Sequence, residues 1–406
     1  MKNLLFVSSE PPFKLFTGGD TQAEIILNFL KKKFKVTIVF WKHNNNKNKI
    51  KIIKKKISEF DSIIIEKKKT NKFIRLAKIF LQFNSYNYNP YNCEIDNKTL
   101  NLIEKKFDYC FLYDPAAVFA FRKIFFLKKI IYHINPTLVL RLNLSQKNAN
   151  NFIGELKKIC WRLYFEKMDK FYYEIIKQTD YIITSMELEF KKIIKFKKKI
   201  IYIPMPHEDD FYSKKKKNNN KNQIVIAHTG HLKNTLTKIS LKWIGEMVVP
   251  LIIKFKLKKR ILFLILGKYK PDKEIKKLFI NVNTVFLGHV SKEKYKKILY
   301  NCDALIFAAK YRIYAFINRI ISAISIPTSI VTTHELRKDF KFLKNNIHLL
   351  SSSNPKKFLQ NIIKLKYDNN LSWKLRNNAR NVYEKQFHPK IFENKLDKFF
   401  INNKIY

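Results

Sequence analysis

Short apolar runs of four to seven residues, each bounded by polar residues, recur along the whole chain. Many are separated by segments whose apolar residues follow helical spacing, at 21–33, 157–177, 239–255, 292–300 and 355–367. Continuous apolar strands that alternate with helices are typical of parallel sheets covered on both faces. We therefore predict an α/β protein throughout, with strands at 3–7, 35–41, 62–65, 109–113, 129–133, 181–185, 200–203, 224–228, 261–267, 284–287, 304–307 and 329–333.

A low-complexity segment at 207–223 interrupts this alternation near the middle of the chain. It is charged, contains no aliphatic residue, and follows a predicted strand that ends in Ile203-Pro204. Because strands and helices restart beyond it, we predict two doubly wound, Rossmann-like domains of similar size that face each other across a cleft. The expected boundaries are 1–206 for an acceptor-binding domain, 207–390 for a nucleotide-sugar-binding domain, and 391–406 for a C-terminal helix that returns to the first domain.

The composition fits a globular protein with an unusual charge. The chain has 406 residues, 46% of them hydrophobic, which is too much apolar material for a disordered polymer. Its formal net charge is +49, with 81 Lys and Arg against 32 Asp and Glu, while only 7 residues are Gly. The bias resembles the output of an AT-rich genome, but the resulting field still attracts phosphates and anionic membranes. Specific nucleic-acid binding is disfavoured, because the cations are mostly Lys rather than forked Arg.

Metal, disulfide and membrane-spanning classes are also disfavoured. The cysteines lie far apart without a CxxC pair or a nearby His cluster, at Cys93, Cys110, Cys160 and Cys302. The most apolar later stretch, 313–333, contains Arg319 and Pro327, and the apolar stretch at the start is too short for a signal peptide. We expect no metal, no cofactor, and a cytoplasmic chain with peripheral attachment to the inner face of the plasma membrane.

Glycines at predicted strand tips are the first candidate chemistry. Gly18 and Gly19 precede a predicted helix. They either let an anion approach the N-terminus of that helix or only form a turn. Gly230 ends a strand and is followed by Lys233, a pattern suited to a nucleotide diphosphate, and Gly267 and Gly288 end two further strands. The neighbouring histidines can be ordinary loop residues, at His228, His231 and His289.

The order of these elements resembles that of group 1 (family 4) glycosyltransferases of the GT-B fold. The resemblance rests on the Gly-Gly loop, on segments 180–185 and 199–204, on LILGKYKPDKEIKKL, VFLGHV and YNCDALIFA, and on the closing helices at 358–365 and 372–387. It covers nearly all of the chain and is more specific in the order of elements than in single residues. It implies the GT-B fold and a donor site at 314–331, where Asn318 and Arg319 form a polar pair.

That donor motif departs from the family pattern. The resemblance implies a Glu that holds the donor's ribose, but Ile320 occupies its position, or Ser322 if two residues are deleted. Ala315 and Ser325 stand at two positions that usually hold Gly. Ser322 can replace the Glu only in part, and a deleted ribose contact commonly weakens binding by about 1–3 kcal/mol. This departure raises the alternative of a catalytically silent GT-B scaffold retained for assembly or membrane association.

For catalysis, His133 at the end of a predicted strand either orients a sugar in the cleft or is satisfied by backbone. Asp114 is a weaker cleft candidate, and no pair of carboxylates indicates a hydrolase. Lys233 and Arg319 are expected to stabilise the leaving diphosphate. We predict a glycosyltransferase that moves a sugar from a nucleotide diphosphate donor to a lipid-linked or polysaccharide acceptor in cell-envelope glycan synthesis. Segment 71–83 is either its membrane contact or a core-facing helix.

Overall fold

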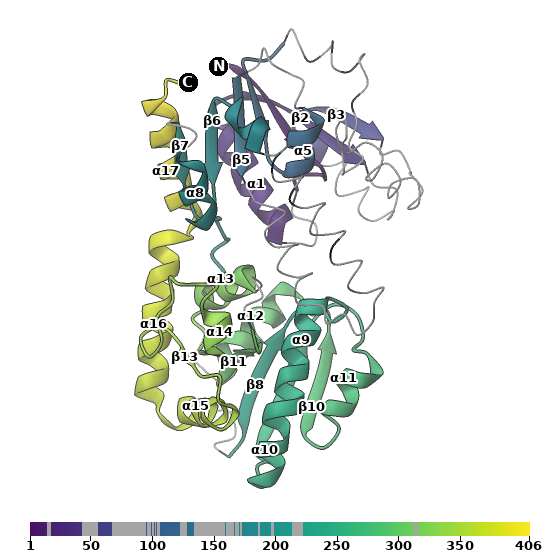
Figure 1. Cartoon of the computed structure of the whole chain (residues 1–406), viewed down its shortest axis with the longest axis vertical. Helices are drawn as coiled ribbons and strands as arrows, with labels where there is room; N and C mark the ends of the chain where they lie inside the picture. Colours follow the sequence, from purple (N-terminus) through teal and green to yellow (C-terminus); the bar gives the residue numbers. More distant parts are fainter. Residues whose placement is uncertain are drawn as a thin grey trace. The chain divides into compact units, whose positions relative to one another are not determined.

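The computed structural model describes residues 1–13, 18–42, 56–66, 95, 99, 101, 103, 106–121, 128–133, 159, 166, 170, 173–185, 187–195, 199–212, 222–311 and 316–406. The chain divides into two compact units (Figure 1). Unit 1 combines Met1–Pro206 with the C-terminal Pro389–Tyr406, and unit 2 is His207–His388. Each unit is built around its own parallel sheet.

Unit 1 contains a seven-stranded sheet in the order β3-β2-β1-β4-β5-β6-β7, in which every described pair is parallel. Its strands are β1 (Asn3–Ser8), β2 (Lys35–Lys42), β3 (Asp61–Glu66), β4 (Tyr109–Leu112), β5 (Lys128–His133), β6 (Tyr181–Thr184) and β7 (Ile200–Tyr202). Its described helices are α1 (Gly18–Lys31), α5 (Pro115–Ala120), α8 (Glu187–Ile193) and α17 (Pro389–Asn402).

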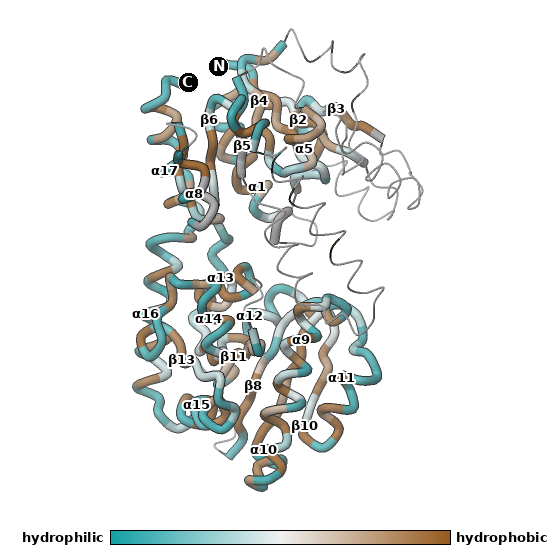
Figure 2. The backbone as a smooth tube through the Cα atoms, viewed as in Figure 1, coloured by the Kyte–Doolittle hydropathy of each residue, from teal (hydrophilic) through white to brown (hydrophobic). Residues whose placement is uncertain are grey.

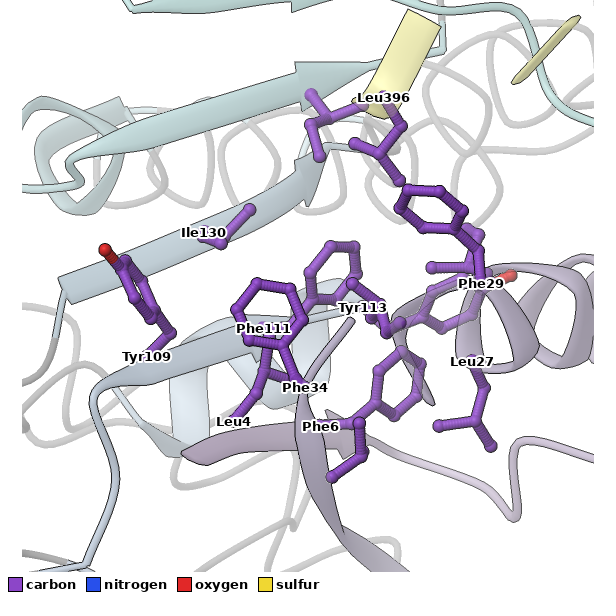
Figure 3. Packing of buried hydrophobic residues seen from close by; sticks show 14 of the residues in the cluster. Leu4, Phe6, Leu27, Phe29, Phe34, Tyr109, Phe111, Tyr113, Ile130 and Leu396 are labelled. Carbon is purple, nitrogen blue, oxygen red and sulfur yellow. The ribbon is translucent and has the colours of Figure 1, made fainter. Parts of the chain in front are cut away.

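The sheet of unit 1 is buried on both faces. Along β1, Leu4 and Phe6 point into one hydrophobic cluster, whereas Leu5 and Val7 point into another. This division follows from the two-residue repeat of a strand and explains why β1 is a continuous apolar run. In the first cluster, Phe6 stacks on Phe111 of β4 with ring centroids 5.4 Å apart (Figure 3).

The last helix, α17, completes the core of unit 1, although the whole of unit 2 separates it in sequence from the rest of unit 1. Four of its side chains belong to the same cluster as Phe6, namely Phe392, Leu396, Phe399 and Phe400. Leu396 enters the cluster from the α17 side in Figure 3. Burial of each such side chain contributes about 1.5–3 kcal/mol, so the C-terminal helix is an integral part of this unit.

Unit 2 contains a six-stranded parallel sheet in the order β10-β9-β8-β11-β12-β13. The strands are β8 (Ile224–Thr229), β9 (Ile261–Leu266), β10 (Asn283–Gly288), β11 (Ala304–Phe307), β12 (Ile330–Thr332) and β13 (Leu350–Ser351). The α-helices are α9 (Thr235–Trp243), α10 (Val249–Lys254), α11 (Lys273–Leu278), α12 (Lys292–Asn301), α13 (Ile317–Ser325), α14 (His334–Arg337), α15 (Pro355–Tyr367) and α16 (Asn369–Gln386). The sheet again separates two clusters, because Ile224 and Ile226 point to one face and Val225 and Ala227 to the other.

The single helix expected at 239–255 is instead three consecutive pieces. A π-helical turn at Ile244–Val248 joins α9 to α10, and Pro250 lies in the first turn of α10. Proline lacks the N–H that an α-helix needs at that point. The wider π-helical turn before it removes the need for that hydrogen bond. The helical direction therefore continues through the proline.

The start of unit 2, within the low-complexity segment at 207–223, packs against the helices of that unit. The Arg380 guanidinium of α16 donates to both carboxylate oxygens of Asp209, at 2.7 and 2.8 Å. The hydroxyl of Tyr383 donates to the carbonyl of His207 at 2.8 Å. Low complexity marked the division between the units, but His207 and Asp209 bond to α16, and Glu208 and Asp210 pair with Lys292 of α12. Residues 213–221 lie outside the described residues.

The fold class predicted from the sequence is confirmed. Each predicted strand is present, and the differences at its ends are small. The two-residue strand β13 was missed, and α1 begins at Gly18 rather than at residue 21. None of the described helices is long and apolar enough to cross a membrane, and Figure 2 shows hydrophilic and hydrophobic residues interleaved along the helices.

Candidate functional site

The candidate site lies at the carboxyl ends of β8 and β9 in unit 2. Gly267, just beyond β9, approaches Gly230, just beyond β8, so closely that a Cβ at Gly267 would overlap the Gly230 carbonyl oxygen. The Gly230 N–H donates to the Leu266 carbonyl at 2.9 Å, and the Gly267 N–H donates to the Gly288 carbonyl at 3.0 Å. These three glycines therefore bring the loops after neighbouring strands into direct backbone contact.

Arg319 of α13 reaches the same edge of the sheet. Its Nη1 donates to the Thr229 carbonyl at 3.0 Å, and its Nη2 donates to the Thr237 hydroxyl of α9 at 3.2 Å. A Cβ at Gly230 would lie 2.6 Å from Thr237 Oγ1 and would clash with the guanidinium. Gly230 is thus required by the close approach of Arg319, which joins three elements of unit 2.

The Arg319 guanidinium is largely buried, yet none of the described carboxylates pairs with it. Its carbon lies 4.7 Å from the centre of the Phe316 ring, which supports a cation without neutralising it. Burial lowers the pKa of Arg319 to about 10, and the nearby Tyr295 hydroxyl partly opposes that shift. The side chain remains cationic at neutral pH, so the site holds a positive charge that no carboxylate among the described residues neutralises.

His228 lies inside β8, close enough to Arg319 to be affected by its charge, and is not the loop residue that the sequence suggested. Its Nε2 is 3.1 Å from the Ser240 hydroxyl of α9, which also accepts the Ala308 N–H at 3.0 Å. Burial, with a smaller contribution from the charge of Arg319, lowers the pKa of His228 to about 3. The imidazole is neutral at pH 7 and links β8, α9 and the end of β11.

Helix α13 places the two candidates for the missing acid differently. Ile320 is fully buried in a hydrophobic cluster, whereas Ser322 lies beside the hydroxyl of Tyr295, which is also near Thr229. Asn318, in the first turn of α13, is exposed, and Phe316 just before the helix has a left-handed φ of 67°. Only Ser322 therefore faces the polar side of the site, and neither position supplies a carboxylate.

Lys233 lies on the loop after Gly230 but does not contact Arg319 through any described bond. Its Nζ is 5.0 Å from the ring centre of Tyr269, and the His231 ring packs on the same tyrosine with centroids 4.6 Å apart. The structure thus brings Gly230, Thr237 and Arg319 together and places Lys233 and His231 beside Tyr269 on the adjoining loop.

The unit 1 candidates belong to a different sheet. Gly18 and Gly19 form the first two residues of α1, and the side chain of His133, at the end of β5, lies outside the described part of the chain. Asp114 is engaged structurally, since it caps α5 by accepting the Ala117 N–H at 3.0 Å and also accepts the N–H of Ser9, just after β1, at 2.6 Å. Burial raises the pKa of Asp114.

Three residues of the site were missed by the sequence analysis: Thr237, Tyr269 and Tyr295. Thr237 and Tyr295 lie on amphipathic helices, where nothing in the spacing distinguishes a polar residue near Arg319 from a solvated one. Tyr269 follows Gly267-Lys268, so proximity to a glycine at a strand tip was the one available signal. Within the described residues there is no group of three or more His, Cys, Asp or Glu side chains able to hold a metal ion.

No protein-family model and no curated protein matches the sequence, but solved structures match it along nearly its whole length. Sucrose-phosphate synthase from Thermosynechococcus elongatus has a TM-score of 0.67 at 9% identity, covering 100% of both chains. HepE from Anabaena, solved in complex with UDP-glucose, has a TM-score of 0.62 at 10% identity, covering 99% of this chain and 100% of HepE.

WaaG, a glycosyltransferase involved in lipopolysaccharide biosynthesis, has a TM-score of 0.59 at 14% identity, covering 98% of this chain and 99% of WaaG. Together with the two parallel sheets, these likenesses show that the chain has the GT-B fold of glycosyltransferases. The resemblance noted in the sequence is confirmed at the level of the fold.

Proposed function

We propose that this protein is a glycosyltransferase that uses a nucleotide diphosphate sugar as donor. The observation that carries the proposal is the largely buried Arg319, which has no carboxylate partner among the described residues and lies at the ligand-binding edge of a doubly wound sheet. A diphosphate is the ligand that such a cation fits, because Arg donates in a fork to phosphate oxygens. HepE, which has the same fold, was solved in complex with UDP-glucose, and this supports the same donor class.

The geometry supports a role for Arg319 in stabilising the leaving group. The hydrogen bonds to Thr229 and Thr237 use two donors of the guanidinium, which has five N–H groups in all, so further donors are available to phosphate oxygens. As the bond from sugar to diphosphate breaks, negative charge grows on the leaving oxygen, and a fixed cation lowers the energy of that state. Lys233, on the loop after Gly230, adds a second cation. We propose no resident metal, because these side chains supply the positive charge.

For the acceptor, we propose a lipid-linked or polysaccharide molecule of the cell envelope, with the chain on the cytoplasmic face of an anionic membrane. WaaG, which shares the fold, is a glycosyltransferase of lipopolysaccharide biosynthesis. The segment first considered for membrane contact, 71–83, lies outside the described residues. A described surface of unit 2 offers a different candidate.

That surface, here called the basic edge, consists of residues 253–260 and 276–283, at the amino ends of β9 and β10. Its two segments contain seven Lys or Arg and no Asp or Glu. Ile253 is 41% exposed, Phe255 44% and Ile280 75%, and Ile253 and Ile280 line one surface hollow with Lys258 and Lys259. Exposed apolar side chains ringed by cations suit an anionic bilayer surface. A membrane contact at the basic edge leaves the carboxyl ends of the strands, where Arg319 lies, free for a water-soluble donor.

The alternative function is a catalytically silent GT-B scaffold. It is favoured by one observation, the absence of an acid at the ribose position, where Ile320 belongs to the core and Ser322 presents only a hydroxyl. A scaffold has no need for a buried cation beside strand-tip glycines, whereas a donor site does. We therefore place transferase activity first.

A panel of nucleotide sugars distinguishes the two functions. Binding is followed by isothermal titration, and turnover by release of nucleoside diphosphate in the presence of membrane extracts. The transferase proposal predicts saturable binding of at least one donor by the wild-type chain and its loss in Arg319→Ala. Absence of binding to every donor at millimolar concentration would establish the scaffold instead.

A further inference from the structure

The loops after β8 and β9 form a small platform beside Arg319. The Leu232 N–H donates to the Lys268 carbonyl at 3.1 Å, and Gly267 lies against the Gly230 carbonyl. These contacts fix the two loops to each other, and the next residue on the second loop is Tyr269. Its position is therefore determined by the same glycines that admit Arg319.

The backbone of Tyr269 is strained. Its φ is 75°, in the left-handed region that residues with a Cβ adopt at a cost of roughly 1–2 kcal/mol. Such residues persist where the surrounding structure holds them, and they cluster at binding sites. A glycine would adopt this conformation without the steric cost, whereas here the loop carries an aromatic ring at this position.

The Tyr269 ring is half exposed and surrounded by cationic groups. It is 44% exposed, packs against the His231 ring at 4.6 Å, and has Lys233 Nζ at 5.0 Å and Lys268 Nζ at 5.4 Å from its centre. His231 steadies the ring from the β8 loop. Lysines so close to an aromatic face favour a ligand that combines a flat ring with negative charge.

We propose that the exposed part of the Tyr269 ring stacks the base of the nucleotide whose phosphates Arg319 holds. This inference rests on the proposed function, because it assigns the base end of the same donor site. His231 immediately follows Gly230, and Gly230 touches the Arg319 guanidinium, so the platform adjoins the anion site. Stacking tolerates any base, and selectivity among bases would come from other groups.

The experiment compares ligands with and without a base. Isothermal titration at 150 mM NaCl measures the binding of UDP, ADP, GDP and inorganic pyrophosphate to the full chain. The ring is removed by Tyr269→Gly, which keeps the left-handed backbone free of strain, and is retained in the matched control Tyr269→Phe. Arg319→Ala marks the binding that belongs to this site rather than to the general positive charge.

We expect Tyr269→Gly to weaken the tightest-binding nucleoside diphosphate by about 5- to 150-fold while pyrophosphate affinity changes less than twofold. Tyr269→Phe should match the wild type for every ligand, and Arg319→Ala should weaken nucleotides and pyrophosphate alike. The inference is overturned if Tyr269→Gly binds nucleotides as the wild type does, or loses pyrophosphate by the same factor.

The failure of the proposed function has a different signature. If the wild-type chain binds none of the four ligands in an Arg319-dependent way, the donor site itself is wrong, and the base platform falls with it. If the wild type binds a nucleoside diphosphate through Arg319 but Tyr269→Gly is unaffected, the donor site stands and the platform alone is rejected.

Discussion

Arg319 and Thr229 are 90 positions apart in the sequence, yet the guanidinium of one donates to the backbone carbonyl of the other at 3.0 Å. The bond connects the first turn of α13 to the last residue of β8, two elements that are not adjacent in the chain. It aims a cation at the edge of the sheet where doubly wound folds bind ligands. Because the same side chain also bonds Thr237, its position is set before any ligand arrives.

Removal of this cation should weaken donor binding. We expect Arg319→Ala to lose about 1.5–3 kcal/mol of nucleoside diphosphate binding, the contribution of a hydrogen bond to a charged group. Arg319→Lys keeps the charge but loses the forked pair of N–H donors, so its affinity for the nucleoside diphosphate should lie between those of the wild type and Arg319→Ala. Isothermal titration provides the measurement, and alanine replacements within the lysine run 214–217 serve as the control. Equal losses in that control would show that the binding is only nonspecific attraction to a basic protein.

The glycines at the strand tips should respond to substitution for different reasons. A Cβ at Gly267 would overlap the Gly230 carbonyl, so Gly267→Ala must displace backbone and should destabilise unit 2 by about 1–3 kcal/mol. Gly288 has open space but a φ of 65°, so Gly288→Ala should cost about 1–2 kcal/mol through the left-handed backbone alone.

Nucleotide affinity separates these two effects. Gly267→Ala moves the loop that carries Gly230 and should also reduce donor affinity, whereas Gly288→Ala should leave it near the wild-type value. Urea unfolding gives the stability changes, and titration of the folded variants gives the affinities. Unchanged affinity in a folded Gly267→Ala would show that the contact between the loops does not shape the site.

The sequence predicted the elements far better than the contacts between them. Strands such as β8 and β11 are continuous apolar runs, which only a sheet buried on both faces explains. Strand β13 was missed because Leu350–Ser351 is too short to show any periodicity. Low complexity at 207–223 marked the division between the units, although it gave no sign that Asp209 pairs with Arg380.

Within the candidate site, Gly230 and Arg319 were predicted because a glycine at a strand tip and an arginine at a helix start each carry a local signal. The direct contact between these two residues was not predicted, since periodicity describes one element at a time. The same limit applies to Tyr269: its left-handed φ depends on the loop after β8, to which residue 268 is bonded. The burial of His228 follows from its place within a central strand of the sheet.

His228 should make unit 2 less stable in mild acid. Its pKa is about 3 when folded and 6.5 otherwise, so the unfolded chain takes up a proton as the pH falls below 6.5 while the folded chain does not. The stability that this neutral histidine contributes is complete above pH 6.5 and is lost progressively down to about pH 3. Between pH 7.5 and 5.5 the loss should be about 1.4 kcal/mol.

The matched control is His228→Gln, which retains a polar group facing Ser240 but does not titrate in this range. Urea unfolding is monitored by hydrogen exchange of peptides from β8 and β11, which gives the stability of unit 2 at each pH. His207, also buried with a lowered pKa, contributes in the same direction in both proteins. The difference between wild type and variant therefore isolates His228, and parallel pH curves would contradict the assignment.

The basic edge of unit 2 should bind anionic membranes through its apolar side chains as well as its charge. Long-range attraction alone would depend only on the lysines, which this protein carries in excess everywhere. Insertion additionally requires Ile253, Phe255 and Ile280, which are exposed on two segments that together carry seven cations. We therefore expect the triple variant Ile253→Ser, Phe255→Ser, Ile280→Ser to bind vesicles of phosphatidylcholine and phosphatidylglycerol at least fivefold more weakly than the wild type, although its charge is unchanged.

Flotation at 150 mM NaCl provides the measurement. The control is Trp373→Ser, which removes an exposed apolar residue of α16 that does not belong to the basic edge. If that control loses as much binding as the triple variant, or if the triple variant binds like the wild type, the attraction is general electrostatics and the basic edge is not the membrane contact.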